Sequence, residues 1–251
     1  MATEFYHPAR WYDLSINWSA RLARELPRLR EVFGPPGEKG LLDAGCGTGR
    51  QAAGLAKLGY RVTGLDADAE MLALAAEHAR GEGASVRLVR GVYDEIPERA
   101  PGPFDGVYCL ANSLAAAGSA AGVHSAISNF ARALRPGGRL FVQVLNFPPM
   151  RAESPCVRGP RVVTHEGIEY VSTRLFRFDE HGVEVTNVTM WREGEWRSHA
   201  HSGRLYPVTP DEFDRWSTAA GLHIDERWGG YGREPFDAQA SVDYILVATR
   251  A

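Results

Sequence analysis

The stretch LLDAGCGTG (residues 41–49) decides the fold of this chain. Its two leucines start a short apolar strand that ends at Asp43, and glycines then alternate at positions 45, 47 and 49. Glycine permits positive φ and close approach of a ligand to the backbone, and the first N–H groups of a following helix are free to bind it. The stretch therefore predicts a strand, a tight turn that can hold a ligand, and a helix.

The glycine spacing separates two kinds of nucleotide ligand. A dinucleotide fingerprint has the pattern GxGxxG, whereas the glycines here follow GxGxG, so the third comes one position early. Asp66 ends the next apolar segment, 23 residues after Asp43, where a carboxylate can accept hydrogen bonds from both ribose hydroxyls. A tight turn also occurs in βαβ units that bind nothing. The two flanking carboxylates favour a nucleoside site, and a nicotinamide oxidoreductase is the least favoured class.

Predicted strands and helices alternate around this stretch. A helix at 15–33 comes first, with Ser15 as its N-cap and with Pro27 expected to kink or split it. Alternation predicts parallel strands joined by right-handed crossovers, hence a doubly wound α/β sheet. The later elements are strands at 60–65, 86–89, 104–110 and 139–145 and helices at 48–58, 69–79 and 119–134.

The pattern changes near residue 150. Residues 161–206 are rich in β-branched and aromatic residues with turn signals between them, which predicts about three antiparallel strands. A helix that starts at Thr209 and two further strands complete the chain. We therefore expect one domain, divided into an N-terminal helical cover (1–36), a cofactor-binding core (37–147), a β insertion or lid (150–206) and a C-terminal helix with the last two strands (207–251).

Composition excludes several classes. The 251 residues include 28 basic and 31 acidic side chains, so the net charge is −3, which argues against a protein that coats nucleic acid. No apolar run is long enough to span a membrane, and the N-terminus lacks the apolar segment of a secretory signal. The three cysteines form no CxxC pair, which favours a reduced, cytoplasmic setting. His199 and His201 alternate as metal ligands can, but without a further ligand beside them we expect no metal.

Five segments, in order, resemble the motifs of the class I S-adenosylmethionine-dependent methyltransferases. The resemblance covers about residues 40–145, and CLANS followed by VLNF is similar to glycine N-methyltransferase and to the N-methyltransferases of deoxyaminosugars. It implies a Rossmann-like, seven-stranded mixed sheet with an antiparallel β insertion after the fifth strand, and S-adenosyl-L-methionine as the cofactor. The segments are LLDAGCGTG (41–49), VTGLD (62–66), RGVYDEIP (90–97), FDGVYCLANS (104–113) and LRPGGRLFV (134–142).

The resemblance also implies which residues bind the cofactor. The backbone of Gly45 and Gly47 would lie against its methionine end, and Asp66 would accept from the ribose diol. Val92 stands where many relatives have an acid that binds the adenine amine, which leaves that role to Asp94 or to backbone. The full set is Tyr12, Trp18, Arg21, Asp43, Ala44, Gly45, Gly47, Asp66, Ala67, Met71, Val92, Tyr93 and Leu110.

On the acceptor side the sequence departs from these relatives. Leu145 precedes Asn146 where glycine N-methyltransferase-like enzymes have an arginine, which argues against a small amino-acid acceptor. Alanines stand where some relatives have a histidine after the Asn-Ser pair. A neutral amine acceptor needs no strong base, whereas a hydroxyl does. The candidate acceptor contacts and bases are Tyr12, Asn112, Asn146, His201 and His7, with Arg204 and Tyr231 placed near the site by analogy.

The sequence thus predicts an enzyme that methylates an N or O nucleophile of a small molecule, as a monomer or homodimer, with neither nucleic acid nor membrane as a partner. Two alternatives stay open. One is a methyltransferase of a macromolecule, RNA or protein, and the other is a regulator that binds the cofactor without turnover.

Overall fold

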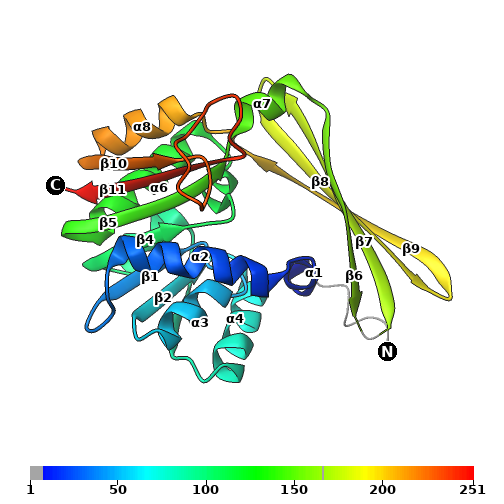
Figure 1. Ribbon diagram of the computed structural model, residues 1–251, viewed down its shortest axis with the longest axis horizontal. Helices are drawn as coiled ribbons and strands as arrows, with labels where there is room; N and C mark the ends of the chain where they lie inside the picture. The colour runs from blue at the N-terminus through cyan, green and yellow to red at the C-terminus, as the bar shows by residue number, and fades with distance from the viewer. Residues whose placement is uncertain (1–7, 166) are drawn as a thin grey trace.

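The computed structural model describes residues 8–165 and 167–251, and a seven-stranded sheet lies at its centre (Figure 1). The strand order is β10-β11-β5-β4-β1-β2-β3; β1 to β5 run parallel, whereas β11 is antiparallel to both β5 and β10. The expected Rossmann-like α/β fold is confirmed. The strands are β1 (Gly40–Ala44), β2 (Arg61–Asp66), β3 (Val86–Arg90), β4 (Phe104–Cys109), β5 (Leu134–Leu145), β10 (Leu222–Trp228) and β11 (Asp243–Arg250).

Helices cover both faces of this sheet because its strands are apolar on both sides. Leu140, Val142 and Val144 of β5 pack in one core cluster, whereas Phe141 between them packs in the other. Such two-sided burial is typical of parallel sheets with helical crossovers. The helices of the first cluster are α5 (Ile96–Arg99), α6 (Ala120–Ala133) and α8 (Pro210–Ala219); those of the second are α2 (Trp18–Phe33) and α3 (Arg50–Lys57), beside which lies α4 (Ala69–Gly81).

The N-terminal helix differs from its prediction in two ways. It is two helices, α1 (Pro8–Leu14) and α2, and the N-cap of α2 is Asn17, whose side chain accepts from the Ala20 amide, rather than Ser15. Ser15 instead donates to the carbonyl of Tyr12 at the end of α1. Pro27 does not split α2, because the residue one turn earlier is exposed and water can satisfy its carbonyl.

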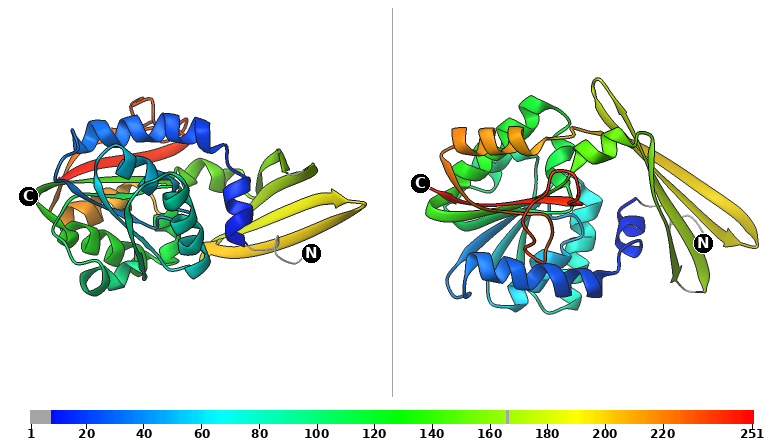
Figure 2. Two further views of the ribbon diagram at one scale, coloured as in Figure 1. Left: turned by 90° about the horizontal axis from the view of Figure 1, so that it is seen from below. Right: turned by 45° about the horizontal axis from the view of Figure 1, so that its top comes forward.

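The β insertion has four strands rather than about three. They form an antiparallel sheet in chain order, which projects from the rest of the molecule in Figures 1 and 2; we call this sheet the arm. An unpredicted helix, α7 (Phe147–Ala152), leads into it, and its two prolines stand in its first turn, where no N–H partner is lost. The arm strands are β6 (Cys156–His165), β7 (Ile168–Asp179), β8 (Gly182–Glu193) and β9 (Glu195–Leu205).

The root of the arm is fixed to the core by an apolar cluster. Phe176 and Cys156 of the arm pack in it with Phe147 and Met150 of α7, and with Ala115 of the 3₁₀ turn that follows β4. No helix within residues 8–165 and 167–251 is long and apolar enough to cross a membrane.

A substitution at Gly49 can test how closely α4 approaches the glycine turn. Its φ is 70°, and a Cβ atom there would lie 2.6 Å from the Cβ of Ala75 on α4. We expect Gly49→Ala to lower the free energy of unfolding by about 2–5 kcal/mol, from left-handed strain plus overpacking. Urea unfolding followed by circular dichroism measures it. Gly83→Ala is the matched control, since φ is 65° there but no atom lies within 4 Å; equal losses in the two variants would contradict the close approach.

Candidate functional site

A cavity of about 210 Å³ lies at the carboxyl ends of β1, β2 and β4. This edge of an open α/β sheet is the usual place for a ligand. Eight of the residues predicted to bind the cofactor line it. The complete lining is Tyr12, Trp18, Asp43, Gly45, Cys46, Gly47, Gln51, Asp66, Asp68, Met71, Leu110, Ala111 and Ser113.

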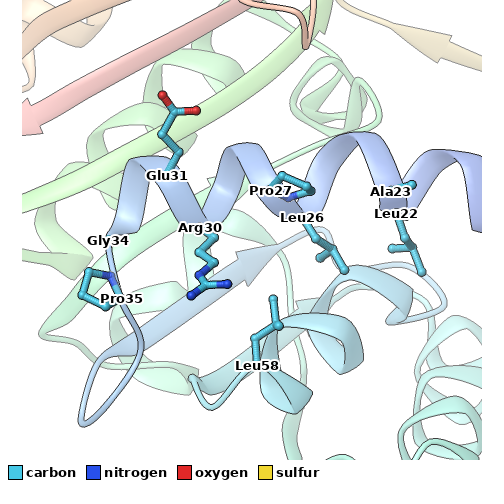
Figure 3. Close-up of a pocket in the computed structure, with 9 residues that line it drawn as sticks. All are labelled: Leu22, Ala23, Leu26, Pro27, Arg30, Glu31, Gly34, Pro35 and Leu58. Atoms are coloured by element: carbon cyan, nitrogen blue, oxygen red, sulfur yellow. The ribbon is translucent and has the colours of Figure 1, made fainter.

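A larger hollow, of about 710 Å³, lies on the flank of the molecule between α2 and the end of α3 (Figure 3). Its lining is mostly apolar, with Leu22, Leu26 and Leu58 among the side chains that Figure 3 shows, and Arg30 and Glu31 are its charged residues. It contains neither a glycine of the turn nor a strand end. The smaller cavity is therefore the candidate site.

The glycine turn has room for glycine alone at its first position. Gly45 has a φ of 83°, and a Cβ there would lie 2.8 Å from the hydroxyl of Tyr93 and 2.9 Å from the Cβ of Ser113. The Gly45 amide donates to the Leu65 carbonyl at 2.8 Å, which joins the turn to β2. The Gly47 amide donates to Oδ2 of Asp66 at 2.8 Å. The backbone of the turn is thus exposed to the cavity and locked to the neighbouring strand.

Two carboxyl groups flank the turn in different environments. Asp43 is buried, and burial raises the pKa of its carboxyl to about 8, with the nearby Asp66 carboxylate adding to the rise. Oδ2 of Asp43 has no hydrogen-bond partner among the residues that the structure describes. Asp66 accepts from the amides of Gly47 and Asp68, and burial raises its pKa as well. The site therefore offers acceptor oxygens to a ligand that carries hydrogen-bond donors or positive charge.

The N-terminal helices cover the cavity with aromatic rings. Tyr12 and Trp18 line it with ring centroids 6.2 Å apart. Arg21 lies behind them: its guanidinium is 5.3 Å from the Trp18 ring centroid, and its Nε donates to Glu25 at 2.8 Å. Glu25 also accepts from Gln51 of α3. Arg21 is not part of the lining, so the structure gives it contacts that position the cover.

Asp13 joins α1 to the glycine turn. Its carboxylate accepts from Thr48 Oγ1 at 2.8 Å and from Arg50 Nη2 at 2.6 Å, and it lies 3.3 Å from Nε2 of His78 on α4. Burial opposes ionisation, but the hydrogen bonds from His78, Arg50 and Thr48 hold the pKa of Asp13 well below its ordinary value. The adjacent Tyr12 is thereby held at the cavity. Sequence reasoning missed this network, because its members come from three distant elements.

Four predicted cofactor contacts lie outside the lining, besides Arg21. Ala44 is buried within β1, and Ala67 is exposed after β2. Val92 is half exposed at the start of the 3₁₀ turn Tyr93–Glu95. Tyr93 lies behind the glycine turn, with its hydroxyl 3.7 Å from the sulfur of Cys109.

The predicted acceptor contacts are spread over the molecule. Asn112 Oδ1 accepts from the Leu145 amide, and Asn146 is buried and donates to the carbonyls of Ala238 and Ser241. Both asparagines thus fix the loops at this end of the sheet, while Oδ1 of Asn146 has no partner in the described part of the chain.

The remaining candidates lie away from the cavity lining. His201 is exposed on β9, Arg204 forms an ion pair with Asp179, and Tyr231 is buried. His7 lies outside the described residues.

Five lining residues were not predicted: Cys46, Gln51, Asp68, Ala111 and Ser113. Asp68 could have been found from the sequence, because an acidic residue directly before a helical pattern predicts an N-cap. In the structure its side chain caps α4 by accepting from the amides of Glu70 and Met71. Gln51 carried none, because Glu25 on another helix holds it.

Comparison with known proteins agrees with this geometry. Residues 41–138 match the family model of a methyltransferase domain. The ubiquinone biosynthesis O-methyltransferase of Sodalis glossinidius is 35% identical to this chain over 148 residues, which are 56% of either chain. The glycine/sarcosine N-methyltransferase of Halorhodospira halochloris is 30% identical over 138 residues, which are 55% of this chain and 51% of that protein. The chain spans about half the length of these relatives.

A solved structure matches over nearly the whole chain. The amino pentose methyltransferase CalS10 of Micromonospora echinaspora, solved with S-adenosylmethionine bound, superposes with a TM-score of 0.75 and 26% identity over 97% of this chain and 95% of its own. Residues 41–138 thus carry a methyltransferase domain, and the chain has the fold of this S-adenosylmethionine-binding methyltransferase. The superposition with CalS10 includes the arm, whereas the ubiquinone and glycine/sarcosine methyltransferases match only about half of the chain.

The cavity of this methyltransferase fold fits S-adenosylmethionine on its own chemistry. The cofactor carries an ammonium group, a ribose diol and a sulfonium cation. The unpartnered oxygen of Asp43 and the carboxylate of Asp66 are acceptors for such donors, and the glycine turn leaves its backbone open to them. The ring of Tyr12 can favour a cation through its π face, whereas the guanidinium groups of Arg21 and Arg50 already lie 5.3 and 5.8 Å from the ring centroid of Trp18.

Asp43 makes stability depend on pH. Its pKa is about 8 in the fold, against an ordinary value near 3.8, so between these pH values the folded chain holds a proton that the unfolded chain has released. The contribution of Asp43 to the free energy of unfolding of the unliganded protein therefore falls as pH rises from about 4 to about 8. We expect Asp43→Asn to remove this decline, so that the variant gains stability relative to the wild type between pH 5 and pH 8.5 in thermal melts. Asp211→Asn, at an exposed carboxylate, is the control; a wild type and an Asp43→Asn variant with parallel pH profiles would contradict the assignment.

Proposed function

We propose that the protein transfers a methyl group from S-adenosylmethionine to a nitrogen or oxygen of a small molecule. The observation that carries the proposal is the cavity in which two differently buried carboxyl groups flank an open glycine turn beneath two aromatic rings. When bound, the cofactor supplies an electrophilic methyl group on a cationic sulfur.

Each part of the site has a distinct task in this proposal. Asp66 accepts from the ribose hydroxyls while its bonds to the turn keep it in place. A cation close to Asp43 favours the ionised form of that carboxyl and so lowers its pKa. Tyr12 and Trp18 cover the site, exclude water and hold the acceptor in line, which is the main requirement of a displacement on a reactive methyl group.

The named relatives support a small acceptor without identifying it. Their names refer to ubiquinone biosynthesis, to glycine and sarcosine, and to an amino pentose. The carboxyl groups in the lining flank the glycine turn and are assigned here to the cofactor; the Tyr12 hydroxyl, which accepts from Arg21 Nη1 at 3.5 Å, is the predicted base that lines the cavity. The site suits a nucleophile that needs little activation, such as a neutral amine, more readily than an aliphatic hydroxyl. The cytoplasmic setting, the monomer or homodimer and the lack of a nucleic-acid partner stay predictions.

Asp66→Asn tests the cofactor site. We expect isothermal titration calorimetry to show binding of S-adenosylhomocysteine to the wild type and a loss of roughly 10- to 100-fold in affinity for the variant, because hydrogen bonds to a charged group contribute about 1.5–3 kcal/mol. Asp211→Asn should bind as the wild type does. Absence of binding to the wild type at millimolar ligand would overturn the cofactor assignment.

The acceptor class is tested by transfer of a radiolabelled methyl group. We expect the protein to label components of a metabolite fraction but neither bulk RNA nor bulk protein, and Asp66→Asn to label none of them at the same cofactor concentration. Labelling confined to RNA or protein would favour the macromolecular alternative. Tight cofactor binding without any labelled product would favour a regulator.

A further inference from the structure

One face of the arm is turned toward the cofactor cavity. Side chains alternate along β7, so Tyr170, Ser172, Arg174 and Phe176 share a face, which we call the inner face. The Tyr170 ring centroid lies 4.8 Å from that of Trp11 on α1, and Phe176 packs in the cluster that contains Ala115.

Both contacts border the candidate site. Trp11 precedes Tyr12, and Ala115 belongs to the turn that begins at Ser113; Tyr12 and Ser113 both line the cavity. Tyr170 and Phe176 are about 20 Å apart along the strand, at about 3.3 Å per residue. Arg174 lies between these two contacts on β7, and Tyr12 of the cavity lining is among its electrostatic neighbours. Figures 1 and 2 show α1 between the arm and the core.

Three arginines gather on this inner face. Arg158 of β6 lies directly opposite Arg174, and Arg161 lies opposite Ser172, so all three point to the same side of the sheet. None of their guanidinium groups forms a hydrogen bond or ion pair with a residue that the structure describes. Burial and the neighbouring Arg161 charge lower the pKa of Arg174. Like charges directly opposite each other destabilise a sheet, so the Arg158–Arg174 pair lowers the stability of the arm.

The outer face of the arm shows the usual arrangement instead. Arg177 lies opposite Glu184, and Arg204 forms an ion pair with Asp179 at 2.6 Å. These two cations of the outer face thus have acidic neighbours. The three clustered arginines without a described partner lie on the side that faces the cavity.

We propose that the inner face of the arm binds a phosphate group of the methyl acceptor, with Arg174, Arg161 and Arg158 as its ligands. The proposal rests on the proposed function and names the acceptor class: a small phosphorylated molecule that presents its nitrogen or oxygen to the cavity. Planar guanidinium forks match the oxygens of phosphate, and three positive charges match a group with two or more negative charges better than a single carboxylate.

The apolar surroundings of the arginines favour a small ligand over a nucleic acid. Trp11, Tyr170 and Trp191 lie at one end, with ring centroids 4.8 and 6.5 Å apart, and the Phe176 cluster lies at the other. A polynucleotide needs a continuing basic track for its backbone, whereas a compact phosphate group fits between these two ends.

Pyrophosphate is the probe that tests the proposal. We expect titration calorimetry to show that it binds the whole protein, with affinity reduced about tenfold or more in Arg174→Gln and in Arg161→Gln, and by less in Arg174→Lys, which keeps the charge but loses the fork. Arg177→Gln is the matched control on the outer face of the same strand and should bind as the wild type does. Thermal melts should show Arg174→Gln to be at least as stable as the wild type, because the substitution removes repulsion.

Several outcomes would overturn the proposal. They are a wild type that does not bind pyrophosphate, an Arg177→Gln variant weakened as much as Arg174→Gln, or a short oligoribonucleotide that binds the same arginines more tightly than pyrophosphate does. Each titration is run with and without S-adenosylhomocysteine. Loss of S-adenosylhomocysteine binding alone would refute the proposed function, whereas loss of pyrophosphate binding alone would refute the arginine site.

Discussion

The close contact between the glycine turn and its neighbours is the constraint on which the rest of the structure depends. Side chains at Gly45 and Gly49 would collide with Tyr93, Ser113 and Ala75. Three neighbouring elements can therefore approach the turn only because these two positions are glycine. This approach brings β1, β2 and the segment after β4 around one cavity. It also lets the Gly47 amide bond to Asp66 while the turn lines the cavity.

The cover of the site depends on a second set of interactions. Asp13 couples α1 to the turn and to α4, and Glu25 couples α2 to α3 through Arg21 and Gln51. The aromatic side chains over the cavity are thus placed by buried charge networks whose members have no other evident task. The same helix α1 meets the arm through Trp11, so the cofactor cavity and the inner face of the arm share one boundary.

Local sequence predicted the strands of the core and its helices other than α5, because their apolar periodicity reflects burial on both faces of the sheet. The four-residue helix α5 is too short to show such a period. It failed at Ser15, since two residues near the α1–α2 junction could act as a cap and packing favoured Asn17. It also failed to find α7, because paired prolines indicate an extended exit unless the backbone places them in a first turn. The number of arm strands was underestimated, since exposed strands such as β9 show little hydrophobic alternation.

The sequence by itself determined the binding turn, the two strand-end carboxylates and the class of cofactor, because these depend on residues of one strand–helix–strand unit, 41–66. The tertiary structure decided what surrounds them: which of the predicted residues reach the cavity, how deeply Asp43 is buried, and which way Arg174 points. Those properties depend on contacts between segments far apart in the chain, such as those of Asp43 with Tyr108 and of Trp11 with Tyr170. Burial and charge at such contacts arise only when the chain folds.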